Sequence, residues 1–326
     1  MSDLLPNIKT IVIKIITDKP VRKTPYQVKG VIMRKHADAT IVPMLNGSYR
    51  NKFLYPRVQV KILNEQIYII GVNEGIDPII ALSEKLKELD FGNITFSIDK
   101  FEVEDYKNQF ISHDNIFKYR FITPWVALNK VTSSQYRVLN DKKKEAYLNK
   151  LLGHNLIFIT NEMGVSLKSG VYAEVNTTSL NPESVDDNKW KAFLGEFKTN
   201  LILPSYIGLG NGITRGFGSI YKESDSEDEL LFSDQDKDLI FTLEDFKKKK
   251  KKLKSQNKLN KKKSRAYFSK NKNRKRQNNS SNRFKSPSRN SYNNRNTKPS
   301  SIEDDGSNDD DQRFNTERYH KQQHKF

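Results

Sequence analysis

The sequence predicts an α+β protein with two successive domains of strands and helices, followed by a long polar tail. Three observations lead to this prediction. The chain has 326 residues, about twice the ~150 residues of a typical domain. Hydrophobic patterns typical of strands and of helices alternate along residues 1–222. Beyond them the composition turns acidic and then strongly basic. We therefore expect domains at 1–112 and 113–222, and a tail at 223–326.

The first domain contains its expected elements in a familiar order. We expect a strand at 8–16, a helix from 25 to about 36, a hairpin of 57–63 and 66–72, a helix after Gly75 with Ile79, Leu82, Leu86 and Leu89 on one face, and a strand at 93–103. Thr24 and Pro25 are typical of a helix start. Strand, helix, hairpin, helix and strand form the ferredoxin-like unit, which has the topology of an RNA-recognition motif.

The second domain repeats this alternation less regularly. We expect a strand at 117–128, a long helix that Thr132 or Ser133 caps and that passes Tyr147 and Leu152, strands at 171–178 and 193–203, a glycine-rich segment at 208–218, and a short strand ending at Tyr221. The predicted fold class is therefore α+β, with two tandem ferredoxin-like (RRM-like) domains.

The tail carries much of the chain's positive charge. The chain has 57 Lys and Arg against 39 Asp and Glu, a net charge of +18, and almost half of the basic residues lie in 246–326. Ordering the backbone costs about 1–2 kcal/mol per residue, which so few apolar residues cannot offset, so we expect disorder. Phe268, Phe284 and Tyr292 could stack on bases. We favour a nonspecific RNA-binding arm over a solubilising linker. Basic clusters of this kind also resemble nuclear-localisation signals.

Composition also excludes several classes of protein. The chain has no cysteine, which excludes disulfides and thiolate metal sites. Its N-terminal apolar stretch contains Lys9 and Lys14, and no segment reaches the ~18 apolar residues of a membrane-spanning helix. We expect a cytoplasmic protein with no membrane association, no metal and no cofactor.

The glycine-rich segment at 198–222 is the sharpest candidate for a binding site. Its glycines let a backbone approach a phosphate chain closely and can expose N–H groups, and Arg215 adds a bidentate phosphate donor. An ordinary glycine-rich hairpin loop is the alternative. The candidate RNA-binding glycines are Gly208, Gly210, Gly212, Gly216 and Gly218.

Two nucleotide-binding motifs are excluded for this segment. A dinucleotide fingerprint that begins at Gly208 would need a glycine where Ile213 stands. A P-loop would need a Gly-Lys-Ser/Thr sequence, which the segment lacks.

At this point the sequence resembles a known family. IGLGNGITRGFGSIY is similar to the C-terminal glycine-rich signature of the Cas endoribonucleases that process precursor CRISPR RNA, especially the branch of subtype I-B systems. Three further segments resemble that branch: FITPWVALN at 121–129, YPRVQVK at 55–61 and Lys29-Gly30 in the first helix. The match covers about residues 8–222 in order. The resemblance implies tandem ferredoxin-like domains and metal-independent cleavage, in which a 2′-hydroxyl attacks the phosphate and acid–base groups move protons.

The resemblance also implies a histidine shortly before the tyrosine-proline strand, where this sequence has none. Asn46 stands about where that imidazole is expected, and an amide cannot shuttle a proton. The nearest histidine is His36, at the end of the first helix, where a surface histidine favoured by the helix dipole is the alternative interpretation. The candidate catalytic residues are His36, with Tyr49 and Lys52 as helpers, and Lys29 is a candidate RNA contact.

Two functions stay open at this stage. The chain is either an endoribonuclease that cuts CRISPR repeat RNA or a catalytically inactive repeat-RNA binder that serves in an effector complex. Asn46 favours the binder, whereas the retained fold and the varied active sites of the family favour the enzyme, which we prefer. The expected partners are CRISPR repeat RNA and other CRISPR-associated proteins, and a homodimer is a further expectation.

Overall fold

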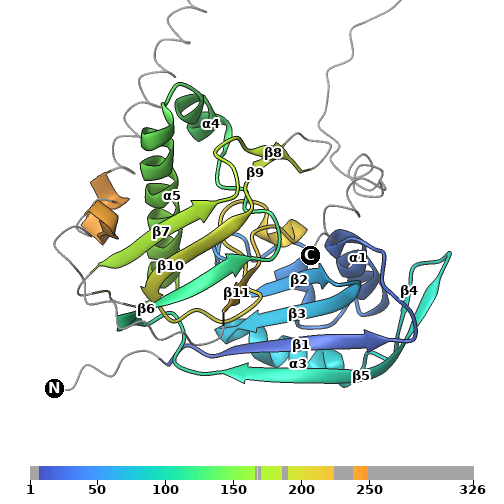
Figure 1. Ribbon diagram of the computed structural model, residues 1–326. Helices are drawn as coiled ribbons and strands as arrows, with labels where there is room; N and C mark the ends of the chain where they lie inside the picture. Colours follow the sequence, from blue (N-terminus) through green and yellow to red (C-terminus); the bar gives the residue numbers. More distant parts are fainter. Residues whose placement is uncertain are drawn as a thin grey trace, which may run out of the picture. The chain divides into compact units, whose positions relative to one another are not determined.

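The computed structural model describes residues 7–165, 167, 170–185, 190–223, 238–244 and 246–248. The first domain carries every element expected of it (Figure 1). Its elements are β1 (Thr10–Thr17), α1 (Pro25–Lys35), α2 (Val42–Leu45), β2 (Val58–Leu63), β3 (Gln66–Val72), a 3-10 turn η1 (Asn73–Gly75), α3 (Ile76–Ser83), β4 (Glu88–Asp90) and β5 (Thr95–Tyr106). They form an antiparallel sheet in the order β2-β3-β1-β5-β4.

Local sequence accounts for two of these elements. The Thr24 side chain accepts from the Gln27 backbone N–H and the Gln27 side chain accepts from the Thr24 N–H, a capping box that starts α1 at Pro25. Asn64 and Glu65 connect β2 to β3 with φ of 48° and 57°. Two successive left-handed residues make the tight hairpin turn whose twist matches that of the strands.

The helix expected after Gly75, α3, is shorter than predicted. α3 ends at Ser83, so Leu86 follows it and Leu89 lies in β4. The backbone of β4 pairs with β5 instead of continuing the helix. Both leucines still bury their side chains, at 3% and 0% exposure, because they enter the same core as the helix.

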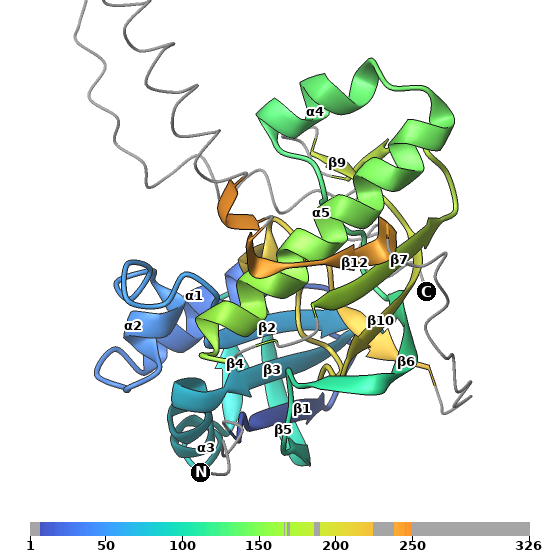
Figure 2. The same cartoon turned by 90° about the vertical axis from the view of Figure 1, so that its left-hand side faces the viewer.

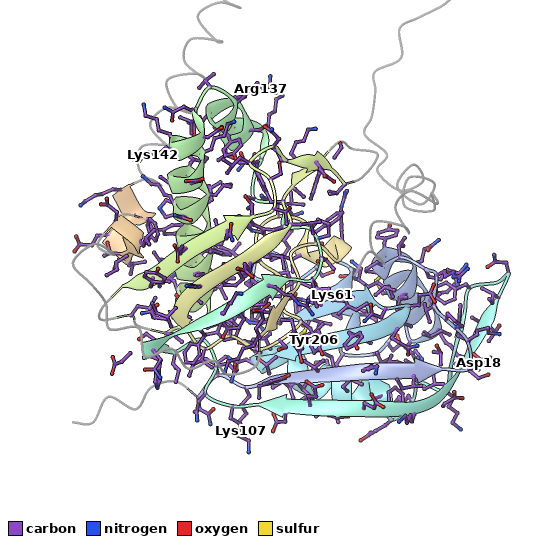
Figure 3. The ribbon with its side chains drawn as sticks, viewed as in Figure 1. Asp18, Lys61, Lys107, Arg137, Lys142 and Tyr206 are labelled. Carbon is purple, nitrogen blue, oxygen red and sulfur yellow. The ribbon has the colours of Figure 1, made fainter. Side chains whose placement is uncertain are left out.

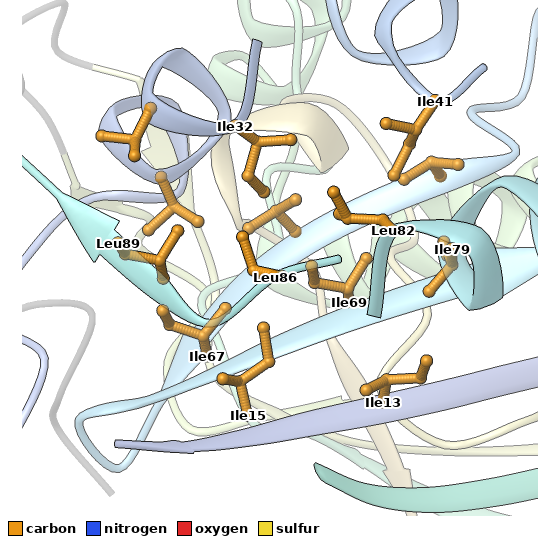
Figure 4. Close-up of a cluster of buried hydrophobic side chains, with 14 of the residues drawn as sticks. Ile13, Ile15, Ile32, Ile41, Ile67, Ile69, Ile79, Leu82, Leu86 and Leu89 are labelled. Atoms are coloured by element: carbon orange, nitrogen blue, oxygen red, sulfur yellow. The ribbon is translucent and has the colours of Figure 1, made fainter. Parts of the chain in front are cut away.

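That core lies between the sheet and the helices (Figure 4). Alternate residues of β1 and β3, such as Ile13, Ile15, Ile67 and Ile69, pack against Ile32 of α1 and against the α3 side. The residues between them face the other side of the sheet. On β2 that other face carries Gln59 and Lys61, which are 1% and 0% exposed.

The four core strands of the second domain have the same order as those of the first, and its fifth strand lies at the opposite edge of the sheet. Its elements are β6 (Ser112–Phe121), α4 (Lys130–Arg137), α5 (Asp141–Glu162), β7 (Val171–Thr177), β8 (Glu183–Ser184), β9 (Lys191–Ala192), β10 (Gly195–Leu201), a 3-10 turn η2 (Ile213–Arg215), β11 (Ile220–Lys222) and β12 (Ile240–Phe241). The sheet runs β11-β6-β10-β7-β12, and β8 and β9 form a separate hairpin. Where the first domain has α3, the second has the glycine-rich loop with η2. The replacement of a helix by this loop explains why the second domain has an irregular sequence pattern.

The long helix expected here is two helices. Asn129 caps α4 by accepting from the N–H groups of Val131 and Thr132, and Asn140 caps α5 by accepting from Lys143. Each asparagine offers the first turn an acceptor, so each starts a new helix. The predicted cap at Thr132 or Ser133 is therefore wrong, because Thr132 is the third helical residue and completes the capping box of Asn129.

One segment of the predicted tail is ordered. β12 pairs with β7 through Ile240 and Phe241, and Figure 2 shows it beside β7 and α5. Gly153 of α5 makes room for the Phe241 ring, because an added Cβ would lie 2.2 Å from it. Two apolar residues of the acidic stretch, Ile240 and Phe241, thus extend the sheet at its edge. Most of the tail lies outside the described residues. Among the helices that the structure describes, none is long and apolar enough to cross a membrane.

Candidate RNA interface

The glycine-rich loop of the second domain lies against β2 of the first. The Lys61 Nζ donates to the carbonyl oxygens of Ile213 at 3.1 Å and Phe217 at 3.3 Å. Figure 3 shows Lys61 on the side of its sheet that faces the second domain. Burial, together with the nearby charge of Lys29, lowers the pKa of this amine to about 7. Lys61 is therefore a supporting residue beneath the loop and is closed off from solvent.

Two more side chains of this strand region hold the start of the loop. The Gly208 N–H donates to Gln59 Oε1 at 2.9 Å, and the Gly208 carbonyl accepts from the Tyr55 hydroxyl at 3.1 Å. Burial raises the pKa of Tyr55, so its hydroxyl keeps its proton and remains a donor. The loop is thus fixed by buried polar contacts from another domain, which make its conformation specific.

These contacts decide which surface is available to RNA. An RNA-recognition motif binds bases on the open face of its sheet. Here the loop covers that face over β2, and Tyr68 of β3 stacks against Tyr206 with ring centroids 4.9 Å apart. Lys14, Glu102 and Glu104 lie near the Tyr68 hydroxyl, and Lys14 pairs with Glu102 at 3.0 Å. The surface of the loop that does not pack on β2 is therefore the candidate RNA interface.

A cleft of about 640 Å³ opens there, between the α1–β2 region and the loop. Its described lining contains the cations Lys29, Arg50, Arg57 and Arg215 and no acidic side chain. The remaining lining residues are Met44, Leu45, Asn46, Gly47, Tyr49, Phe53, Leu54, Pro56, Trp190, Gly210, Asn211, Gly212, Ile213 and Thr214. Across the part of the chain that the structure describes, no three His, Cys, Asp or Glu side chains are grouped to hold a metal ion.

Lys29 joins the two sides of this cleft. Its Nζ donates to the Thr214 carbonyl at 2.8 Å, and only 8% of the residue is exposed. Burial, together with the charge of the neighbouring Arg215, lowers the pKa of Lys29 to about 8. A positive charge that is costly to bury here would be stabilised by a phosphate entering the cleft.

The arginines of the cleft differ in how freely they can meet a ligand. Arg57 is 6% exposed and is held by Glu74 at 2.8 Å and by the Glu162 carbonyl at 3.0 Å, so it stiffens the cleft wall. Arg215 lies over the Trp190 ring, 4.9 Å from its centroid. Arg50 is exposed at the cleft rim. Arg50 is therefore the arginine best placed to contact a phosphate, while Arg215 lines the cleft with its guanidinium over the Trp190 ring.

The glycines of the loop have two different roles. Gly210 and Gly212 line the cleft, with φ of 84° and 73°. The N–H groups of Gly216 and Gly218 donate inside the protein, to the carbonyls of Ile213 and Pro124. Like Gly208, these two glycines shape the loop and do not line the cleft. A glycine-rich pattern cannot separate these roles, because both require the same residue type.

Some of the candidate catalytic residues line the cleft and others do not. Asn46 and Tyr49 line the cleft, whereas His36 and Lys52 are not among its lining residues. His36 caps the end of α1, and burial with the nearby Lys35 and Lys85 lowers its pKa. The amine of Lys52 lies over the Tyr49 ring, 5.2 Å from its centroid. The position where the sequence lacks the expected histidine thus faces the cleft, while the nearest histidine does not.

The cleft residues that the sequence analysis did not identify include Arg50, Trp190 and Asn211. Trp190 follows a polar stretch and precedes a two-residue strand, so no hydrophobic periodicity indicates it. The sequence feature that could have identified Trp190 is a lone aromatic residue in a polar segment. Lys61 was visible as a lysine within a strand, but its burial depends on the second domain.

The fold and the cleft define a class of protein: two tandem ferredoxin-like domains with a basic cleft beside a glycine-rich loop. Comparison with known families identifies the class. The Cas6b N-terminal domain profile matches residues 6–109 and the Cas6b C-terminal domain profile matches residues 111–223. The chain belongs to the Cas6b family, which confirms the resemblance found in its sequence.

Two solved structures agree with this assignment. A crystal structure of Cas6b is 27% identical with a TM-score of 0.55, and covers 67% of this chain and 100% of its own. The structure of a CRISPR RNA processing endoribonuclease, Cas6b, is 24% identical with a TM-score of 0.51 and the same coverage, which supports the fold. An uncharacterized protein of Methanocaldococcus jannaschii, MJ0978, is 30% identical over 109 residues, 33% of this chain and 74% of that protein.

Proposed function

We propose that this chain binds CRISPR repeat RNA in the basic cleft and cleaves it there, with the 2′-hydroxyl as nucleophile and without a metal ion. The observation that carries the proposal is the cleft itself. Four cations and no acidic side chain line its described part, and both domains contribute to it. A structure of a family member is described as a CRISPR RNA processing endoribonuclease. Neutralising phosphates is the main source of affinity for RNA backbones.

The cleft supplies groups for the reaction. The 2′-hydroxyl must lose a proton as it attacks, and the 5′-oxygen of the leaving strand must gain one. Tyr49 lines the cleft and carries a hydroxyl that can position or donate a proton. Lys29, whose pKa is near 8, can stabilise the negative charge that develops on the phosphate. The role of His36 in proton transfer stays a prediction, and it would require His36 to reach the cleft when RNA is bound.

Repeat-RNA binding without cleavage is the second candidate. It is favoured by the described cleft lining, which contains no histidine and has Asn46 at the position expected to carry one. Such a protein would keep the cations and the loop, and would act with other CRISPR-associated proteins. Association with those proteins and homodimerisation stay predictions.

Incubation of the full chain with its host's repeat RNA in excess EDTA distinguishes cleavage from binding without cleavage. Specific cleavage that persists in EDTA and leaves a cyclic phosphate supports the proposal. Loss of cleavage in EDTA contradicts metal independence, and a shifted but intact RNA supports the binder.

Two variants test whether the cleft is the binding surface. Arg50→Ala should weaken binding and reduce the steepness of its salt dependence by about 0.7 in the log–log slope, as expected for one lost phosphate contact. Lys143→Ala is the matched control, because Lys143 is exposed on α5 and outside the cleft lining. Equal salt slopes for both variants would contradict the assignment of the cleft.

A further inference from the structure

A second hollow of about 360 Å³ adjoins the cleft on the side of the second domain. Trp190 and Asn211 line both spaces, so these two side chains separate the cleft from the hollow. The other lining residues are Val126, Leu128, Asn129, Lys130, Ser133 and Lys191. Its volume falls within the ~300–1,000 Å³ range of small-ligand sites.

The chemistry of this hollow differs from that of the cleft. Val126 and Leu128, 1% and 5% exposed, provide apolar walls together with the Trp190 ring. Asn129, Ser133 and Asn211 add polar groups, and no acidic side chain occurs in the described lining. An apolar slot with a few polar groups suits a planar heterocycle better than a phosphate chain.

The wall at Trp190 is held in place. The ring contacts Phe217 with centroids 6.3 Å apart, and the Arg215 guanidinium lies over it at 4.9 Å. Gly212 allows this approach, because an added Cβ would lie 2.6 Å from the indole. A fixed aromatic ring that already bears a guanidinium is suited to hold an unpaired base, since both groups stack on bases.

The polar groups match the edge of a base. The side-chain amide of Asn211 donates to the Val126 carbonyl at 3.0 Å, which fixes its orientation. An asparagine amide pairs well with the donor and acceptor edges of bases, adenine in particular. Lys130 and Lys191 are exposed at the rim, where they can meet the phosphates on either side of that base.

We infer that this hollow is a base-binding subsite: one unpaired nucleotide of the RNA leaves the cleft, passes Trp190 and inserts its base into the hollow that Trp190, Val126 and Leu128 line. The inference rests on the proposed function for the path of the RNA. The subsite gives the second domain a means of reading one base, whereas the cleft itself contacts the backbone.

The test uses repeat RNAs that carry a single abasic nucleotide, moved through every position. One position should lose about 5- to 150-fold in affinity, as expected for one stacked base. The chain has two tryptophans, and Trp125 is fully buried, so RNA should quench the fluorescence of Trp190. Trp190→Phe should remove this quenching, and the abasic RNA should not produce it.

A second variant protects the test from misfolding of the Trp190 variant. Ser133→Phe should fill the hollow and weaken repeat-RNA binding at least fivefold. For this variant, an abasic nucleotide at the sensitive RNA position should cause no further loss of affinity. Ser134→Phe is the matched control, since Ser134 is exposed on α4 and outside the hollow's lining. Equal affinities of the two variants, with no quenching by RNA, would overturn the subsite and leave the proposed function standing.

Failure of the proposed function can be distinguished from failure of the subsite. If the wild-type chain binds no repeat RNA, the proposed function fails, and eight-nucleotide oligoadenylate and oligouridylate become the probes. Quenching by either oligonucleotide that Ser133→Phe removes and Ser134→Phe keeps would still support the subsite. No quenching would overturn both.

Discussion

The Lys61 ammonium nitrogen lies 3.1 Å from the Ile213 carbonyl oxygen and donates to it, which ties β2 of the first domain to the glycine-rich loop of the second. The pair places a titratable group beneath the candidate RNA interface. Lys61 is 0% exposed, and the pKa of its amine falls to about 7 from an ordinary value of 10.5. Stability and loop geometry therefore depend on the same side chain.

This pair predicts how stability varies with pH. Between about pH 7 and 10.5 the unfolded chain binds a proton at Lys61 that the folded chain does not, so the free energy of unfolding rises with pH, by at most about 1.4 kcal/mol per unit. Lys61→Met should remove this contribution, while the smaller contribution of Lys29, whose pKa is also lowered, remains. Urea unfolding of both proteins at pH 7, 8 and 9 measures it, with the exposed Lys35→Met as control. Parallel pH dependences for wild type and Lys61→Met would contradict the buried amine.

Lys29 predicts a pH dependence of RNA binding. Its pKa is about 8, so raising the pH through this value removes one positive charge from the cleft. Repeat-RNA affinity should fall, and the salt slope should become about 0.7 less steep. Lys29→Arg should abolish both changes, because a guanidinium stays charged. Filter binding at pH 7 and 9 tests this, and an unchanged salt slope in the wild type would exclude Lys29 as a phosphate contact.

Gly218 should be required for folding more than for contact with RNA. Its φ is +68°, and an added Cβ would lie 2.0 Å from the Leu209 carbonyl oxygen. Gly218→Ala should cost more than about 2 kcal/mol, from backbone strain and overpacking together. Gly92→Ala has similar strain at φ +86° but nothing within 4 Å, so only about 1–2 kcal/mol is expected. Equal losses in thermal unfolding would show that the loop can relax around the added atom.

Cleavage assays separate the candidate catalytic groups. If Tyr49 acts in the cleft, Tyr49→Phe should lower the cleavage rate by roughly 10²- to 10⁴-fold with little change in affinity. His36→Ala should leave the rate unchanged if His36 stays outside the cleft. Asn46→His should raise the rate, because the new imidazole would face the cleft. Loss of activity in His36→Ala alone would instead assign proton transfer to His36.

The basic tail predicts an electrostatic contribution that is blind to sequence. Removing residues 249–326, which lie outside the described part, should flatten the salt dependence of binding to any RNA. Preference for the repeat over a scrambled RNA should persist, since the two domains form the proposed interface. Competition binding measures this preference. Its disappearance on truncation would place recognition in the tail.

Much of the fold is determined by local sequence. Thr24, Pro25 and Gln27 start α1, Asn64 and Glu65 turn the hairpin, and alternating isoleucines define β1 and β3. The order of these elements was enough to predict tandem ferredoxin-like domains. These features act over a few residues, so a single sequence reveals them.

The candidate site depends on contacts between distant segments. Lys29 meets Thr214 across 185 residues, and Lys61 meets Ile213 across 152, so neither burial nor a lowered pKa could be inferred from the neighbouring sequence. The same holds for the division of the glycines, since only the packing of the loop on β2 turns Gly208 inward and leaves Gly210 at the cleft. Sequence determined which residue types gather in the loop. Tertiary structure alone decided which of them face the cleft, because that choice follows from hydrogen bonds to residues such as Gln59 and Pro124, which are far away in the sequence.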